Sequence, residues 1–150
     1  DLMNLWFFKK IIFIGAHKMS DHEGILYTIE NGKNGEASIT GQKPLAYQKL
    51  DVNGWKVKQI SKSGLEINVY QVAPNTIYQA HKAPVDLICV VSEGFGELFL
   101  TDEAGLEISH IKCKKGDAYF QGANTLHGFR NGTEETVLIY IENLKTDNDY

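Results

Sequence analysis

Short runs in which apolar and polar residues alternate constrain the fold of this chain more than any other feature. Segments 55–60 and 65–72 both follow a period of two, the pattern of a β-strand with one buried and one solvated face. Turn residues, Asn53-Gly54 and Ser63-Gly64, bound these runs, and no segment of helical periodicity separates them. Similar runs follow at 87–91, 97–101, 106–111, 118–121, 126–130 and 136–142. The sequence therefore predicts an all-β jelly roll or barrel.

The apolar residues of these runs supply the predicted core. With 43% hydrophobic and 23% charged residues among 150, the chain has the composition of a globular protein with one core. We expect that core within a domain spanning residues 45–150. Its predicted members are Ile60, Ile67, Val69, Leu87, Val90, Leu98, Leu100, Phe120, Phe129 and Ile139.

Residues 1–44 are predicted to form an N-terminal arm and linker. The apolar blocks within Leu5–Ile14 are split by Lys9-Lys10, so they are too short for a membrane span and do not have the pattern of a signal peptide. Residues 30–44 are rich in glycine, which indicates a loop. One hypothesis is that residues 1–18 are not native, because a methionine follows them. A large exposed apolar segment is a liability on a monomer, so we expect a homodimer in which this arm buries apolar surface; packing on its own barrel is the alternative.

Charge and cysteine content exclude several classes of protein. The formal net charge is −4 and no basic stripe is present, which argues against a nucleic-acid partner. Cys89 and Cys113 have no metal-binding spacing, and a chain of this length does not need a disulfide. We interpret them as free buried thiols, with one bridge as the alternative, and expect a cytoplasmic protein without a membrane partner.

Two segments combine polar residues with turn residues in a specific order. The segment 74–97 contains His81, then Asp86, and reaches a turn at Gly94. The segment 116–131 opens on Gly-Asp and contains His127, with Asn131 four residues later. Together they resemble the two signature motifs of the cupin superfamily. The resemblance implies a small RmlC-like monocupin, with a cupin-type jelly-roll β-barrel after the N-terminal arm.

The resemblance also implies a metal site inside the barrel. His81 and His127 match the first histidine of one motif and the histidine of the other, and Asp86 matches the glutamate. These three would bind a divalent ion, Fe, Mn, Ni or Zn, with positions open for a ligand. The motif is incomplete, because Ala83 stands at the second histidine and aspartate is shorter than glutamate. The turns depart from it as well, at Asn75, Gly122 and Asn124.

Other pocket residues are predicted in case Asp86 faces solvent. Gln79, Gln121 or water would then complete the ligand set, and Phe129 is expected to line the same pocket. Histidines that have lost their metal and are simply hydrogen-bonded inside the barrel are the alternative interpretation of the pair.

Three classes of function fit these observations. The first is a metal-dependent isomerase or dioxygenase acting on a small polar molecule, such as a sugar derivative, a keto acid or a small aromatic. The second is a non-catalytic small-molecule binding or sensor module with a degenerate metal site, which Ala83 favours. The third is a structural dimerisation module. The cupin fold hosts many activities, so the fold alone does not choose among them.

Overall fold

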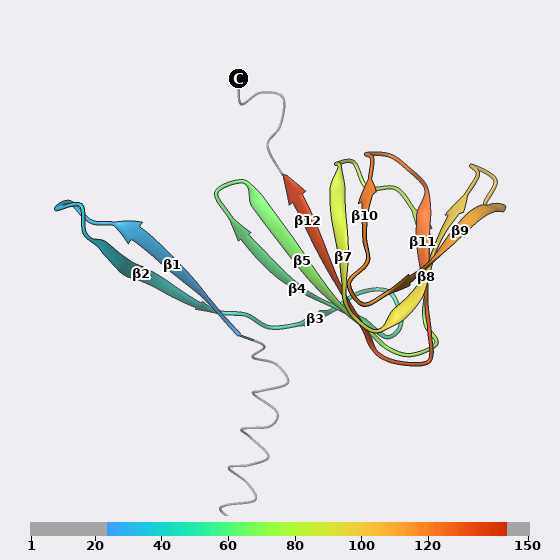
Figure 1. Ribbon diagram of the computed structural model, residues 1–150, viewed down its shortest axis with the longest axis horizontal. Coiled ribbons are helices and arrows are strands. Elements are labelled where there is room, and N and C mark those ends of the chain that lie inside the picture. Colours follow the sequence, from blue (N-terminus) through green and yellow to red (C-terminus); the bar gives the residue numbers. More distant parts are fainter. Residues whose placement is uncertain (1–23, 144–150) are drawn as a thin grey trace, which may run out of the picture. The chain divides into compact units, whose positions relative to one another are not determined.

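A computed structural model describes residues 24–143, which consist of strands, turns and loops (Figure 1). The chain divides into two compact units, residues 1–47 and 48–150. Within the described part, the structure contains no helix long and apolar enough to cross a membrane. The prediction of an all-β fold is confirmed.

The first unit is a β-hairpin over its described residues. Strand β1 (Ile25–Asn31) pairs antiparallel with β2 (Ala37–Pro44), with an irregularity after Thr28. The interpretation of residues 30–44 as a loop is therefore wrong over β2. Its glycines misled the prediction: Gly35 has a φ of 81° in the turn, whereas the β-branched Ile39 lies opposite Ile29 in the ladder.

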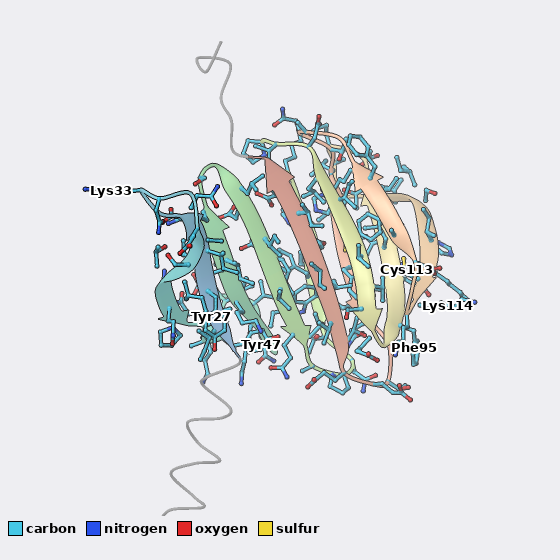
Figure 2. The ribbon with its side chains drawn as sticks, turned by 60° about the vertical axis from the view of Figure 1, so that its left-hand side comes forward. Tyr27, Lys33, Tyr47, Phe95, Cys113 and Lys114 are labelled. Atoms are coloured by element: carbon cyan, nitrogen blue, oxygen red, sulfur yellow. The ribbon has the colours of Figure 1, made fainter. Side chains whose placement is uncertain are left out.

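The second unit consists of two antiparallel sheets that face each other, the architecture of a jelly roll (Figures 1 and 2). The six-stranded sheet has the order β10-β7-β12-β5-β4-β3, and the four-stranded sheet has the order β6-β11-β8-β9. The strands are β3 (Gln48–Lys49), β4 (Trp55–Lys62), β5 (Leu65–Val72), β6 (Ile77–His81), β7 (Leu87–Glu93), β8 (Phe95–Thr101), β9 (Glu107–Lys114), β10 (Ala118–Gln121), β11 (His127–Asn131) and β12 (Thr136–Asn143).

The core lies between the two sheets. Its buried residues are Trp55, Val72, Leu87, Cys89, Val91, Leu98, Cys113, Phe129, Leu138 and Tyr140. Both cysteines are free, as expected, and burial raises the pKa of the Cys89 thiol to about 12, which keeps it un-ionised at neutral pH.

The predicted core is correct in part. Leu87, Leu98 and Phe129 are buried, but Phe120 is 69% exposed on the outer face of the six-stranded sheet. The remaining six predicted residues are only partly buried: Ile60, Ile67, Val69, Val90, Leu100 and Ile139. Both faces of this sheet carry apolar side chains, so alternation alone did not reveal which set faces inward.

Candidate functional site

His81 and His127 lie side by side inside the barrel. His81 ends β6, His127 begins β11, and the two residues are directly opposite each other in the ladder. Their ring centroids are 4.5 Å apart with an interplanar angle of 54°. His127 is only 2% exposed. Strand pairing thus brings together two histidines that are far apart in sequence.

Both imidazoles are held in the same way. The Nδ1 atom of His81 is 2.9 Å from the carbonyl oxygen of Gln79, and the Nδ1 atom of His127 is 2.9 Å from that of Thr125. A carbonyl oxygen can only accept, so each Nδ1 must carry the hydrogen. The Nε2 atom of each neutral ring therefore keeps its lone pair, which is the tautomer that binds metals or accepts a proton.

Gln121 is the third polar side chain of this cluster. It ends β10, is buried, and its Nε2 lies 2.8 Å from Nε2 of His127, to which it donates. The same amide nitrogen lies 2.6 Å from Nδ1, but the hydrogen of Nδ1 already points to Thr125, so Nε2 is the acceptor. The Oε1 atom of Gln121 is buried without a hydrogen-bond partner. A buried acceptor without a protein partner is costly, so Oε1 is a candidate contact point for a water molecule, an ion or a ligand.

An aromatic wall surrounds the histidine pair. The cavity between them has a volume of about 30 Å³ and is lined by Trp55, Tyr70, Tyr78, His81, His127, Gly128, Phe129 and Tyr140. That volume holds one water molecule or one ion. Desolvation lowers the pKa of His127, the Thr125 carbonyl opposes this effect, and neighbouring His81 lowers the pKa further. The site thus favours a neutral imidazole at physiological pH.

Asp86 lies outside this cluster. Its side chain is exposed, and its Oδ1 accepts a hydrogen bond of 2.8 Å from the amide of Ala123. The described residues include no group of three His, Cys, Asp or Glu side chains placed to hold a metal. The following residue, Leu87, points into the core, and neighbouring residues of an extended chain point to opposite faces. Asp86 therefore points away from the core, and its hydrogen bond with Ala123 holds the loop before β11 in place.

Gln79 and Phe129 lie on opposite sides of the four-stranded sheet. Phe129 lines the histidine cavity, as expected. The Gln79 side chain is exposed and lines a different cavity, together with Ile77 and Phe99. Gln79 serves the site through its backbone carbonyl, which holds His81. The sequence analysis did not predict Trp55, Tyr70 and Tyr78 as site residues, because isolated aromatic residues in strands are typical of a hydrophobic core and do not by themselves indicate a site.

The atypical turns of the two motifs have a local explanation. Asn75 and Asn124 have φ values of 58° and 62°, in the left-handed region. Asparagine tolerates this region better than any other residue except glycine, so it can replace the usual glycine. The amide of Asn124 also donates to the carbonyl of Ala83 at 2.7 Å, which links the loops of the two motifs beside the site.

Asn131 fastens the two sheets together at the other end of β11. Its Nδ2 lies within hydrogen-bond distance of the carbonyls of Val72 (3.2 Å), Ala73 (2.9 Å) and Glu134 (2.8 Å). Its Oδ1 accepts from the amide of Gly132 and the hydroxyl of Thr136. These contacts give the motif asparagine a structural role.

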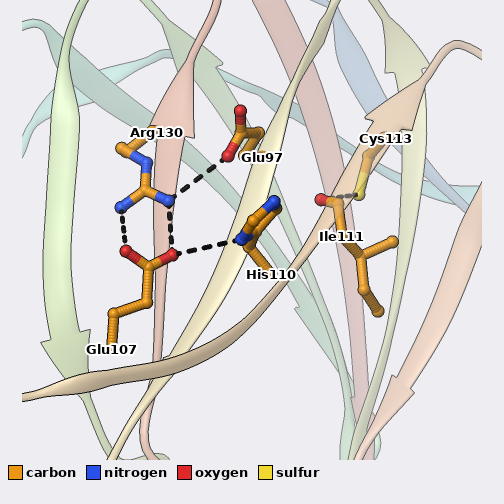
Figure 3. A network of polar contacts seen from close by, with 6 residues as sticks. All are labelled: Glu97, Glu107, His110, Ile111, Cys113 and Arg130. Carbon is orange, nitrogen blue, oxygen red and sulfur yellow. Dashed lines mark hydrogen bonds and ion pairs between the residues drawn. The ribbon is translucent and has the colours of Figure 1, made fainter.

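A charged network covers the outer face of the four-stranded sheet (Figure 3). The guanidinium of Arg130 donates to both carboxylate oxygens of Glu107, at 3.1 and 2.6 Å, and to Glu97 at 3.3 Å. It also lies 4.4 Å from the ring centroid of Phe99. His110 lies 3.6 Å from Glu107. Because these partners come from β8, β9 and β11, the network ties three neighbouring strands together.

Two partly exposed carboxyl groups face each other on the inward-facing side of the six-stranded sheet. Glu66 and Glu142 are paired across β5 and β12, in the same cross-strand row as Leu87 and Gln121. Burial raises the pKa of Glu142, and the charge and hydrogen bond of Glu66 raise it further. No sequence motif predicts this pair, because only strand register brings its two members together.

Comparison with known proteins supports the fold. No protein-family model matches the sequence, and no curated protein matches it. KdgF from Halomonas sp. is 18% identical with a TM-score of 0.57, over 69% of this chain and 92% of that one. A putative ethanolamine utilization protein Q from Salmonella typhimurium is 18% identical with a TM-score of 0.55, over 82% and 98%. An RmlC-like cupin from Shewanella frigidimarina is 15% identical with a TM-score of 0.56, over 71% and 89%. The chain has the cupin jelly-roll fold.

Proposed function

We propose that this chain binds a divalent transition-metal ion through His81, His127 and Gln121, and that a small polar molecule completes the coordination. The observation that carries the proposal is the arrangement of acceptors. His81 is fixed with Nε2 as a free acceptor, Nε2 of His127 accepts from the Gln121 amide, and the buried Oε1 of Gln121 has no donor. A turn of that amide would release Nε2 of His127 and bring Oε1 beside it. Three protein ligands suffice for a metal that also binds a substrate.

The donor set indicates which ion and which ligand would fit. Imidazole nitrogens suit Fe, Ni and Zn better than Mg or Ca, and an amide oxygen is a weaker third ligand. Because all three side chains are neutral, they leave the charge of a divalent ion uncompensated. A ligand with a carboxylate or another anionic oxygen, such as a keto acid, would complement it.

The chain's own residues would orient such a ligand and exclude water. A bound ion would supply Lewis acidity, which polarises an oxygen of the ligand and supports isomerase chemistry; oxygenase chemistry would require a redox-active ion such as Fe. The ring of Tyr78 lies 4.3 Å from that of His81 and restricts its rotation, while Trp55 and Phe129 seal the cavity from the core side. The two free buried cysteines support a cytoplasmic setting within this proposal.

A metal-free binding module is the second candidate function. Five aromatic rings line the cavity, belonging to Trp55, Tyr70, Tyr78, Phe129 and Tyr140. Such a wall favours a single methyl or ammonium group of a ligand, which is what a cavity of about 30 Å³ can hold and which needs no metal.

Elemental analysis of natively purified protein separates the two candidates. We expect about one Fe, Ni, Mn or Zn per chain if the three-ligand site is correct. His127→Ala and Gln121→Leu should lose the metal while keeping the β-sheet circular dichroism spectrum. Asp86→Ala is the matched control and should keep it. Metal loss in Asp86→Ala alone would refute the assignment of Gln121. Wild-type protein that neither contains nor takes up these ions would favour the metal-free module.

A further inference from the structure

A cleft opens on the outer face of the four-stranded sheet, away from the histidine cavity. It has a volume of about 720 Å³, against about 30 Å³ for the histidine cavity. Small-molecule sites in proteins commonly measure about 300–1,000 Å³, so this cleft has room for a whole organic molecule. We call it the outer cleft, and its lining includes Phe95, Glu97, Lys112, Lys114, Arg130 and Gly132.

A phenyl ring that lies on a glycine forms one wall of the outer cleft. A Cβ atom added at Gly132 would lie 2.3 Å from Cε2 of Phe95 and 2.6 Å from Cδ2, so the ring occupies space that only glycine leaves open. The amide of Gly132 also donates to the carbonyl of Phe95 at 3.1 Å. Phe95 nevertheless remains 40% exposed. The ring is thus held against the backbone and still offers a surface on which another flat ring can stack.

Two lysines of β9 stand beside this ring. Lys114 lies directly opposite Phe95 in the β8–β9 ladder (Figure 2). The residue between the two lysines, Cys113, is buried in the core, so Lys112 and Lys114 both point outward. Residues two apart in a strand are about 7 Å apart, and lysine has a long flexible stem. Both ammonium groups can therefore reach the same anion.

These two ammonium groups have no partner, whereas the other charges of the outer cleft do. Glu97 accepts from Arg130 at 3.3 Å, and Arg130 is bound further within the network of Figure 3. The Oδ2 atom of Asp117 accepts from the backbone amide of Lys114 at 2.9 Å. Among residues 24–143, by contrast, neither the Lys112 nor the Lys114 ammonium forms an ion pair. The charge left for a ligand is therefore positive.

We propose that the outer cleft binds a small molecule in which a flat ring is joined to an anionic oxygen group, a carboxylate or a phosphate. The ring stacks on Phe95, and the anionic group lies between Lys112 and Lys114. No residue of the histidine cavity takes part, so the proposal is independent of the proposed function. Mononucleotides and aromatic carboxylates share this chemistry, and separate titrations distinguish them.

Isothermal titration of the full chain with adenosine 5′-monophosphate and with benzoate tests the proposal. We expect saturable binding of at least one of them, weakened by added salt because an ion pair contributes. Adenosine, benzamide and inorganic phosphate should bind about tenfold more weakly, since each offers only one of the two contacts. The proposal is overturned if neither probe binds, or if adenosine or benzamide binds as tightly as its anionic counterpart.

Substitutions in the outer cleft locate the bound probe. Phe95→Ala should lower the affinity about tenfold, and Lys112→Gln and Lys114→Gln should each lower it a few-fold. All three side chains are exposed, so the variants should fold. Lys115→Gln is the matched control, because Lys115 follows in the chain but pairs with Glu93 at 3.0 Å, and it should bind normally. An equal loss in Lys115→Gln and Lys114→Gln would show only general charge attraction and would overturn the site.

Two further variants separate ring contact and location. Gly132→Ala should displace the Phe95 ring and weaken the ring-bearing probe while leaving the weak binding of inorganic phosphate unchanged. His127→Ala should bind the probe as wild type does. Loss of binding in His127→Ala, with Phe95→Ala unaffected, would place the probe in the histidine cavity and overturn the proposal.

Discussion

His81 and His127 are cross-strand neighbours whose rings are 4.5 Å apart and whose Nδ1 atoms both contact the carbonyl two residues earlier in the chain. This repeated arrangement fixes the tautomer of each ring through the backbone alone. Two Nε2 atoms without hydrogens thus line one small aromatic cavity, one of them accepting from Gln121. The strand pairing that builds the barrel therefore also builds the site.

Replacing Ala83 by histidine should strengthen metal binding. Ala83 lies two residues after His81, on the same side of an extended segment, and packs against the core. An added imidazole would give a fourth ligand, so we expect metal affinity to rise by about tenfold or more. Isothermal titration with Zn or Ni measures the change, and Ala83→Leu is the control for added bulk. Equal affinities in all three proteins would place the ion away from residue 83.

Stability should fall in mild acid because of His127. Its pKa in the folded state lies below the ordinary value of 6.5, so the unfolded chain binds the proton more readily. The contribution of His127 to stability is therefore complete above about pH 6.5 and is lost as the pH falls below that value. Urea unfolding at several pH values should show a steeper loss in wild type than in His127→Phe. Parallel curves would show that His127 titrates normally.

The carboxyl pair has the opposite pH dependence. The pKa of Glu142 is raised above 4.5 in the folded state, so its favourable contribution exists at low pH and is lost as the pH rises through the folded pKa. At neutral pH we expect Glu142→Gln to be more stable than wild type, with the difference disappearing in acid. The exposed Glu134→Gln serves as the control. A Glu142→Gln protein that is less stable at neutral pH would mean that the ionised carboxylate is needed.

Removing the Asn131 side chain should destabilise the fold strongly. It leaves several buried backbone groups without partners, and at about 1 kcal/mol for each lost contact we expect a loss of about 2–4 kcal/mol in Asn131→Ala. Asn131→Asp should be worse, because a second acceptor would then face three carbonyl oxygens. Denaturant unfolding measures both variants. An aspartate variant as stable as wild type would show that the donor side of Asn131 contributes little.

The turn at Asn124 offers a stabilising change. Its φ of 62° suits glycine, so Asn124→Gly should be neutral or slightly stabilising, whereas Asn124→Ala should cost about 1 kcal/mol. Melting temperatures of the two variants provide the comparison. Equal melting temperatures would show that the loop relaxes to another conformation at no cost.

The sequence predicted what depends on local pattern and missed what depends on strand register. Alternation and turn residues identified most strands, and the motif spacing identified the two histidines. Alternation did not distinguish Phe120 from Gln121, because the sheet is apolar on both faces. Leu87 was correctly predicted in the core, but the motif match also placed Asp86 inside, and neighbouring residues of an extended chain point to opposite faces. The Glu66–Glu142 pair was missed because its members are brought together only by the pairing of β5 with β12.

The contacts of Asn131 make the two ends of the barrel differ in how well they tolerate substitutions. At the Asn131 end, one side chain contacts the backbone of several segments, so a substitution there removes contacts of both sheets and destabilises the fold. At the histidine end, the loops at residues 82–86 and 122–126 meet through two contacts, Asn124 to Ala83 and Ala123 to Asp86. Under the proposed function, ligand specificity could therefore change through these two loops without loss of the fold, and they are the positions to randomise when selecting for binding.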